Sequence, residues 1–218
     1  MRGGTNQRLR TLASHIHLTF TYEHDWGFGW IAAEPPAMER ASHALAHEGG
    51  VWLVDPVDGD GLHERIAALG EVRGVLQLLD RHPRDGAALA ARYGAPRIET
   101  PFDGLPGTPF EIIGLTNRKR WREVALWWPG PAVLAVPEAL GTTAFFAPPG
   151  ERVGVHALLR LTPPHRLTGI PARHLLVGHG PPLEGDDVPE QIARAVTRSR
   201  RDMPKLLIGM ARAVRASR

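Results

Sequence analysis

The stretch HLLVGHGPP at residues 174–182 decides the fold of this 218-residue chain. Its first four residues have the apolar character of a buried strand, and the glycines and prolines that follow predict a sharp loop. His179 lies in the middle of this loop, directly after the strand. Because α/β folds place their chemistry in the loops at strand ends, His179 is the first candidate site residue.

Upstream of this stretch, apolar segments of strand length alternate with segments of helical periodicity. The predicted strands are residues 26–33, 40–47, 51–54, 75–79 and 95–99, and the predicted helices are 62–69 and 86–93. Three short apolar strands at 110–115, 124–128 and 133–136 then follow without a helix, which is typical of an antiparallel meander. Helices are expected again at 156–161 and 188–199. This order predicts an α/β fold, an αββα sandwich of two mixed β-sheets flanked by helices.

Basic residues are concentrated in the last 25 residues of the chain. The chain has 26 Lys and Arg against 23 Asp and Glu, and residues 194–218 hold eight of the basic residues and a single acid, Asp202. We therefore expect an N-terminal extension over residues 1–25, one domain over 26–200 and a basic C-terminal helix over 201–218, packed on the domain or appended to it. This helix could contact an acidic partner, and no motif for specific nucleic-acid binding accompanies it.

The chain has no cysteine, which excludes disulfides, thiolate metal sites and cysteine nucleophiles. Any metal must therefore be held by histidines and carboxylates. No apolar run reaches the length of about 20 residues that a membrane-spanning helix needs, and the first residues lack the apolar core of a secretory signal. A cytoplasmic location is expected.

Four stretches of the chain resemble the metallo-β-lactamase fold superfamily. HLLVGHGPP at 174–182 is similar to the closing G-H-G-P motif of that superfamily, in which the histidine is a metal ligand. LVD at 53–55 resembles its strand that ends in an Asp-rich turn, LQLLDRHPRD at 76–85 resembles the loop with its H-x-H-x-D-H metal motif, and AVLAVPEAL at 132–140 resembles the later strand that carries a bridging carboxylate. The resemblance covers about residues 26–200 and implies a metal-dependent hydrolase with an αββα fold.

The loop at residues 80–85 departs from the metal motif of the superfamily. An ungapped match puts Asp80 at the first histidine, His82 at the second, Arg84 at the aspartate and Asp85 at the last histidine. Arg84 is the largest change, because a cation repels a nearby metal ion and is no proton acceptor. The superfamily's site for two metal ions is therefore not expected, and the metal motif is degenerate.

The remaining candidates allow one metal ion at most. Glu138 stands where the resemblance implies the bridging aspartate. The predicted metal ligands are His82, His179, Asp80 and Glu138, the predicted catalytic carboxylates are Asp85 and Glu138, and Arg84 is the predicted ligand-binding residue. Two histidines with carboxylates suit one zinc, iron or manganese ion, and a chain without any metal is the other expectation.

Two functions remain open from the sequence. The first is a hydrolase-like protein in which a single metal ion activates water against a small ester, amide, thioester or phosphoester. The alternative is a catalytically silent, metal-free member of the fold that binds a small molecule or a protein, with Arg84 in the former cation position. The metal-free alternative suits an anionic ligand, because a guanidinium binds carboxylates and phosphates.

Overall fold

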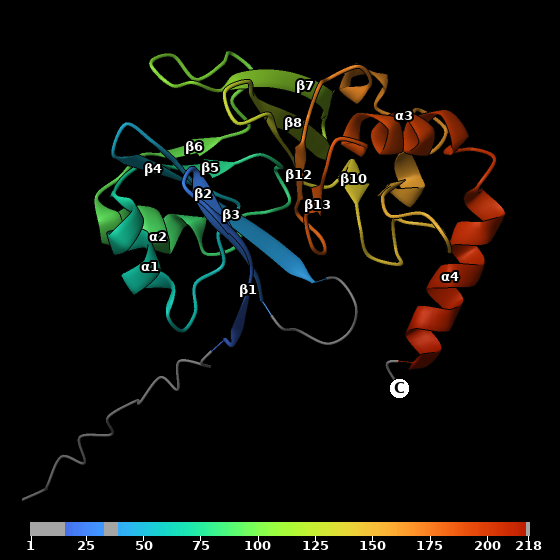
Figure 1. Cartoon of the computed structure of the whole chain (residues 1–218), viewed down its shortest axis with the longest axis horizontal. Helices are drawn as coiled ribbons and strands as arrows, with labels where there is room; N and C mark the ends of the chain where they lie inside the picture. Colours follow the sequence, from blue (N-terminus) through green and yellow to red (C-terminus); the bar gives the residue numbers. More distant parts are fainter. Residues whose placement is uncertain (1–15, 33–38, 217–218) are drawn as a thin grey trace, which may run out of the picture.

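The computed structural model describes residues 16–32 and 39–216, which form two mixed β-sheets (Figure 1). The six-stranded sheet has the order β1 (Leu18–His24), β2 (Gly27–Ala32), β3 (Arg40–His47), β4 (Gly50–Val54), β5 (Glu71–Gln77) and β6 (Arg97–Glu99). Its first four strands are antiparallel, and β5 and β6 run parallel to β4. The five-stranded sheet has the order β13 (Leu183–Glu184), β12 (His174–Val177), β9 (Val133–Val136), β8 (Trp121–Trp128) and β7 (Glu111–Arg118). Within it, β12 and β9 are parallel and the other pairs are antiparallel.

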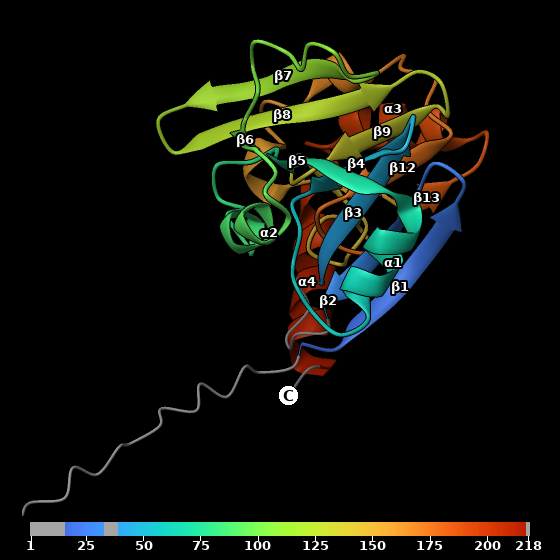
Figure 2. The same ribbon diagram turned by 90° about the vertical axis from the view of Figure 1, so that its left-hand side faces the viewer.

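Helices cover the outer faces of both sheets. The four α-helices are α1 (Leu62–Leu69), α2 (Gly86–Tyr93), α3 (Val188–Arg198) and α4 (Met203–Ala216). Figure 2 views the molecule from the side of α1 and α2, which lie over the six-stranded sheet, while α3 lies on the far side of the five-stranded sheet. Short elements complete the fold: β10 (Leu140–Gly141), β11 (Gly154–Val155) and the 3₁₀ turns η1 (Ala157–Leu159) and η2 (His165–Leu167). The predicted αββα sandwich is confirmed.

The alternation of side chains along each strand builds the three apolar layers. In β4, Val51 and Leu53 pack toward α1 and α2, whereas Val54 packs between the two sheets. In β12, Leu175 and Val177 pack on the α3 side and Leu176 packs between the sheets. A strand buried on both faces reads as a continuous apolar run, which is why both segments were recognisable in the sequence.

Two elements differ from the sequence prediction. Residues 18–24, inside the segment expected to be an N-terminal extension, form strand β1 and pair with β2; residues 1–15 lie outside the described part. Leu18, Phe20 and Tyr22 alternate with polar residues at the period of a half-buried strand, whereas the prediction began the first strand only at Trp26. The helix predicted over 156–161 is only the three-residue turn η1, in which His156 Nδ1 accepts the Leu158 amide and the next residues turn away.

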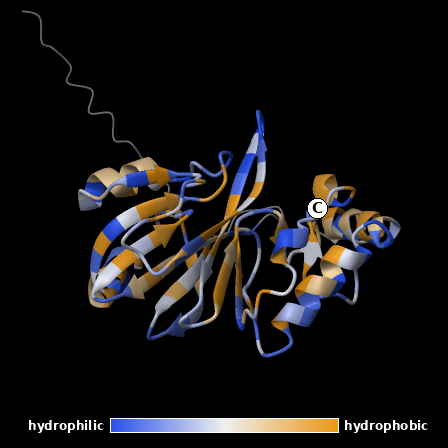
Figure 3. Cartoon of the chain, turned by 90° about the horizontal axis from the view of Figure 1, so that it is seen from above, coloured by the Kyte–Doolittle hydropathy of each residue, from blue (hydrophilic) through white to orange (hydrophobic). Residues whose placement is uncertain are grey.

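The C-terminal helix α4 packs by one side only. Leu206 on α4 is fully buried, whereas Leu207 and Ile208 are 56% and 53% exposed. Figure 3 shows both hydrophobic and hydrophilic segments in the helical region beside the C-terminus. Among residues 16–32 and 39–216, no helix is long and apolar enough to cross a membrane.

The parallel strands position the candidate site. Strands β4 and β5 in one sheet, and β9 and β12 in the other, point their carboxyl ends toward the same edge of the sandwich. Single β-bridges between Arg40 and His179 and between Leu79 and Glu123 join the two sheets at this edge. Loops that leave the carboxyl ends of parallel strands are the usual place for a binding site in such folds.

Candidate functional site

A cavity of about 600 Å³ opens where the four strand ends meet. It is lined by Arg40, Arg81, His82, Pro83, Arg84, Glu138 and His179. A smaller cavity of about 270 Å³ lies beside η2 and β7, and its lining residues include one imidazole and no carboxylate. The larger cavity therefore carries the titratable groups that chemistry needs.

His82 is buried in the wall of the cavity, and a carboxylate fixes its ring. Its Nδ1 lies 3.0 Å from Asp55 Oδ2, and Asp55 Oδ1 accepts a 2.9 Å hydrogen bond from the Leu78 amide. Burial raises the pKa of Asp55, but the hydrogen bond to His82 and the charge of Arg84 more than reverse this shift, so the carboxyl group is ionised. Burial and the charge of Arg84 lower the pKa of His82, which is neutral at neutral pH. Asp55 thus accepts a hydrogen bond from the Nδ1–H of His82, which leaves Nε2 as the acceptor nitrogen of this ring.

His179 forms a pair with His82 across the two sheets. Their Nε2 atoms lie 3.2 Å apart, and both rings are buried. The His179 ring stacks on Phe146, with centroids 5.5 Å apart and planes 19° from parallel. Two imidazoles from separate loops therefore direct their Nε2 atoms at one point in the cavity wall.

Glycines on both sides of His179 allow its loop to pass close to other backbone. A Cβ on Gly178 would lie 2.1 Å from the carbonyl oxygen of Pro137, at the end of β9. Gly180 has φ +101°, and a Cβ there would lie 2.4 Å from Thr142 Oγ1. Since any other residue would clash at both places, the two glycines fix the path that holds His179 in position.

Arg84 forms hydrogen bonds with three separate segments of backbone beside the cavity. Its guanidinium donates hydrogen bonds to the carbonyl oxygens of Ala41, Asp55 (2.7 Å) and Gly178 (2.9 Å). Burial lowers the pKa of Arg84 to about 10, so the group is still charged at neutral pH. Arg84 therefore places a fixed positive charge beside the imidazole of His82, with its Nη2 3.4 Å from Nδ1.

Glu138 is the carboxylate of the cavity wall. Its Oε2 lies 2.7 Å from Arg81 Nη2, and its Oε1 lies 3.4 Å from His156 Nε2. The Arg81 guanidinium also covers the face of the Trp121 ring at 4.0 Å. Only 10% of the Glu138 side chain is exposed, and burial lowers the pKa of His156. The neutral imidazole therefore gives a polar contact, and Arg81 gives the ion pair that holds the carboxylate in place.

A second carboxylate, Glu123, supports the backbone that carries Glu138. Glu123 is fully buried. Its carboxylate accepts a 2.7 Å hydrogen bond from Trp121 Nε1 and hydrogen bonds of 2.9 and 2.6 Å from the backbone amides of Glu138 and Ala139. Burial raises the pKa of Glu123 to about 7. This buried group holds the loop after β9 from behind.

Solved structures share this arrangement of strands and loops. TMB-1 is similar over 84% of this chain and 97% of its own length, with 12% identity and a TM-score of 0.60. The metallo-β-lactamase FIM-1 from Pseudomonas aeruginosa, in its mono-zinc form, is similar over 87% and 97%, with 12% identity and a TM-score of 0.57. The chain has the metallo-β-lactamase fold. A fragment of a putative diflavin flavoprotein from Nostoc sp. PCC 7120 is also similar, over 85% of this chain and 98% of its own length, with 10% identity and a TM-score of 0.56. No family model matches the sequence, and no curated protein does.

The metallo-β-lactamase fold raises the question of whether these residues fit a metal ion. In tetrahedral zinc sites with Zn–N bonds of about 2.0–2.1 Å, two nitrogen ligands lie about 3.3 Å apart. The Nε2 atoms of His82 and His179, at 3.2 Å, match that spacing, and Asp55 provides the carboxylate that supports one imidazole from behind. The Arg84 guanidinium also lies near Nδ1 of His82, with its Nη2 3.4 Å from that atom, and its charge opposes a second ion. The spacing of His82 and His179 therefore fits one metal ion.

The other predicted ligands do not join His82 and His179 as a close group. Within residues 16–32 and 39–216, neither Asp80, Asp85 nor Glu138 forms a set of three ligand atoms within 4.8 Å of one another with the two histidines. Asp80 does not line the cavity, and its Oδ1 is buried without a hydrogen bond from the described residues. Asp85, predicted as a catalytic carboxylate, does not line the cavity: it is the residue before α2, and its Oδ2 accepts the Asp58 amide at 2.9 Å. Glu138 alone of these carboxylates faces the cavity.

Several residues of the site were not selected from the sequence. Asp55 was part of the stretch that carries the resemblance, and an acid directly after an apolar strand is the signal that could have marked it. Arg40 and Arg81 contribute two cations to the cavity lining, but neither has a sequence pattern around it. Glu123 sits inside an apolar strand, where a lone carboxylate is a warning of a buried polar contact.

Proposed function

We propose that this chain is a hydrolase-like enzyme that directs water at a small ester, amide, thioester or phosphoester bond in the 600 Å³ cavity. One observation carries the proposal. The Nε2 atoms of His82 and His179 face each other at 3.2 Å, with an ionised Asp55 behind one of the rings. One Nε2 donates its hydrogen to the other Nε2 in this contact, and a bound metal ion would replace that proton and accept both lone pairs. The pair is therefore suited to hold a metal ion in a cavity open to a small molecule.

His82 and His179 would hold the single metal ion that the fold allows. A zinc ion there would supply a bound water of lowered pKa and would polarise the bond to be broken. Asp55 fixes the tautomer and the orientation of His82 through the 3.0 Å hydrogen bond. Phe146 limits the rotation of His179 by stacking on its ring.

The remaining groups favour an anionic substrate. Arg40, Arg81 and Arg84 face the same cavity, and a carboxylate or phosphate on the substrate would be attracted by these guanidinium groups. The same positive charges would stabilise the negative charge that develops as water attacks. Glu138, already placed by Arg81 and His156, is the carboxylate within the cavity that we propose to accept a proton.

A hydrolysis screen with paired variants tests the proposal. The purified full chain is assayed on chromogenic ester, amide, thioester and phosphoester substrates, with zinc, iron or manganese added and after chelation. We expect His82→Gln and His179→Gln to lower kcat/KM at least about 100-fold, and Asp55→Asn to lower it about 10- to 100-fold. His165→Gln, on an exposed turn away from the cavity, should have no effect.

One outcome of the hydrolysis screen would contradict the proposal. If none of the four substrate classes is turned over with any of the three metals, the chain is not a hydrolase for small molecules. The binding module that the sequence left as the alternative would then be examined with anionic ligands. The cytoplasmic location and the acidic partner expected for the basic C-terminal helix stay predictions.

A further inference from the structure

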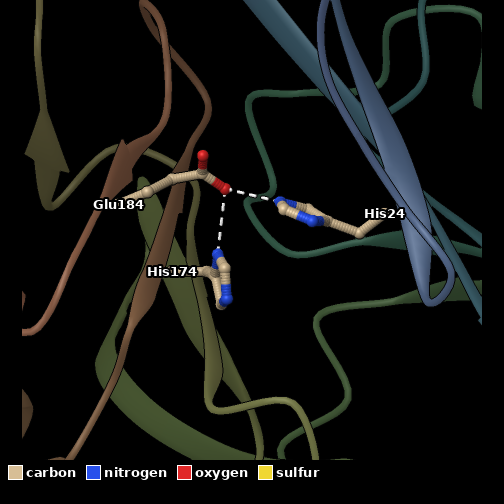
Figure 4. A group of neighbouring side chains, drawn as sticks. All are labelled: His24, His174 and Glu184. Carbon is tan, nitrogen blue, oxygen red and sulfur yellow. Dashed lines mark hydrogen bonds and ion pairs between the residues drawn. The ribbon is translucent and has the colours of Figure 1, made fainter.

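A second cluster of metal-ligating side chains lies at the opposite end of the sheets. His24 ends β1, His174 begins β12 and Glu184 ends β13 (Figure 4). His24 Nε2 lies 2.8 Å from Glu184 Oε1, and His174 Nδ1 lies 2.9 Å from the same oxygen. In the described residues, these three form the one group of at least three His, Asp or Glu side chains whose ligand atoms all lie within 4.8 Å of one another.

The ligand types in this cluster are those of a divalent transition metal. Two imidazole nitrogens and one carboxylate oxygen are a recurrent set for zinc, with further positions left for water. Figure 4 shows both rings pointing their nitrogen atoms at the Glu184 carboxylate from different sides. The three groups therefore converge on a small volume without help from a fourth residue.

The backbone and the neighbouring aromatic rings hold the cluster in place. His174 and Glu184 are direct partners in the β12–β13 ladder, so two of the three ligands are fixed by one register. His24, from the other sheet, stacks on Trp26 with centroids 4.6 Å apart and planes 18° from parallel. The Trp26 ring also meets the edge of His174, with centroids 5.0 Å apart. Ligands held in this way lose little freedom when an ion binds.

The cluster is also accessible to an ion from solution. The exposed fraction of the side chain is 33% for His24, 19% for His174 and 38% for Glu184. The nearby guanidinium of Arg173 is engaged elsewhere, with its Nη2 2.8 Å from Asp186 Oδ1. An ion can therefore enter from the surface, and water can complete its coordination.

We propose that His24, His174 and Glu184 form a site for one divalent transition-metal ion such as zinc. The site links β1 of the six-stranded sheet to β12 and β13 of the other sheet. It shares no residue with the cavity at the other end of β12, so it does not depend on the proposed hydrolase function. Its role is to join the edges of the two sheets when metal is bound.

Zinc binding by the full chain tests the site. Equilibrium dialysis against zinc chloride, followed by elemental analysis, gives the number of ions per chain for the wild type and for Glu184→Gln. We expect Glu184→Gln to lose about one equivalent, or to bind that equivalent at least about tenfold more weakly. His24→Gln should do the same, and the matched control His165→Gln should leave the zinc content unchanged.

A spectroscopic readout assigns the ion to this cluster. Cobalt should quench the emission of Trp26, because its ring touches both histidines, and the quenching should fall in Glu184→Gln. A circular dichroism spectrum of each variant confirms that it is folded. Zinc content that is the same in wild type, Glu184→Gln and His24→Gln overturns the proposal, as does a wild type that binds no zinc. Hydrolysis is measured on the same samples: it should persist in Glu184→Gln and be lost in His82→Gln, so failure of the two proposals can be told apart.

Discussion

Strand β12 has a histidine at each end, and the two ends have opposite electrostatic surroundings. Before the strand, His174 faces a carboxylate, Glu184. After the strand, His179 faces a second imidazole, His82, and the charge of Arg84 lies behind that ring. Histidines at the two ends of one strand can therefore face side chains of opposite charge. The charge of the neighbouring side chains decides whether more than one cation can approach each histidine.

The two ends also differ in burial. The side chains of His82 and Asp55 are 8% and 3% exposed, whereas those of His174 and Glu184 are 19% and 38% exposed. Electrostatic interactions are strong where water is excluded and weak where it is present. Substitutions in the cavity should therefore change stability much more than substitutions in the surface cluster.

The largest effect is expected for Arg84→Ala. This variant removes the guanidinium that donates to the carbonyl oxygens of Ala41, Asp55 and Gly178, and with it the cation beside the ionised Asp55. Ser42 Oγ and the Ala41 amide remain as donors to the Asp55 and Gly178 oxygens. We expect the free energy of unfolding to fall by about 3–5 kcal/mol in urea denaturation. Arg73→Ala, which removes a guanidinium from an exposed ion pair with Glu71, should change it by less than about 1 kcal/mol. Equal effects of the two variants would contradict the burial argument.

A smaller, pH-dependent effect is expected at His43, which lies between the two ends of β12. Its Nδ1 lies 3.3 Å from Tyr22 Oη and its Nε2 lies 3.1 Å from the Val177 carbonyl oxygen. Burial lowers the pKa of His43 to about 4, and the charge of Arg84 adds to this while Asp55 opposes it. Between pH 6.5 and 4 the unfolded chain therefore binds a proton at this residue that the folded chain does not bind, and stability falls as the pH falls.

The contribution of His43 to the pH dependence of stability is measured by comparing the wild type with His43→Gln. The shift corresponds to about 3 kcal/mol between pH 6.5 and 4. His82, whose pKa is also lowered, adds to the total slope of the wild type. In urea denaturation at several pH values, His43→Gln should lose about 3 kcal/mol less than the wild type over this range. A slope that is unchanged in His43→Gln would show that the imidazole is protonated in the folded chain.

The smallest effect on stability is expected for Glu184→Gln without metal. Its ion pairs with His24 and His174 are at the surface, so the free energy of unfolding should fall by less than about 1 kcal/mol. Thermal denaturation in the presence of a chelator measures this. A loss as large as that of Arg84→Ala would mean that the surface cluster is itself part of the core, and the contrast between the two ends would fail.

Local sequence patterns were sufficient for most of the fold. The helices 62–69 and 86–93 and the strands 133–136 and 174–177 have the bounds that the sequence predicted. Each of the two helices has apolar residues at helical spacing and ends at a glycine, and each of the two strands is a short apolar run buried on both faces. Strand β1 carries the same kind of signal, since Leu18, Phe20 and Tyr22 alternate with polar residues, but the prediction placed this segment in an N-terminal extension.

The candidate site was predictable only in part. His82, Arg84, Glu138 and His179, which the sequence picked out, line one cavity, because each follows a strand and those strands end at the same edge. The cluster of His24, His174 and Glu184 left no signal in the sequence. Its members come from two sheets, and only the packing of those sheets brings them together.

The close contact between Gly178 and the Pro137 carbonyl has a consequence for how related sequences are interpreted. A Cβ at 2.1 Å from that oxygen is excluded whatever chemistry the neighbouring imidazole performs. Selection would therefore keep the glycine in descendants that have lost their catalytic ligands. The G-H-G-P string therefore reports the path of the chain, and the residues facing His179 must be considered separately to infer an activity.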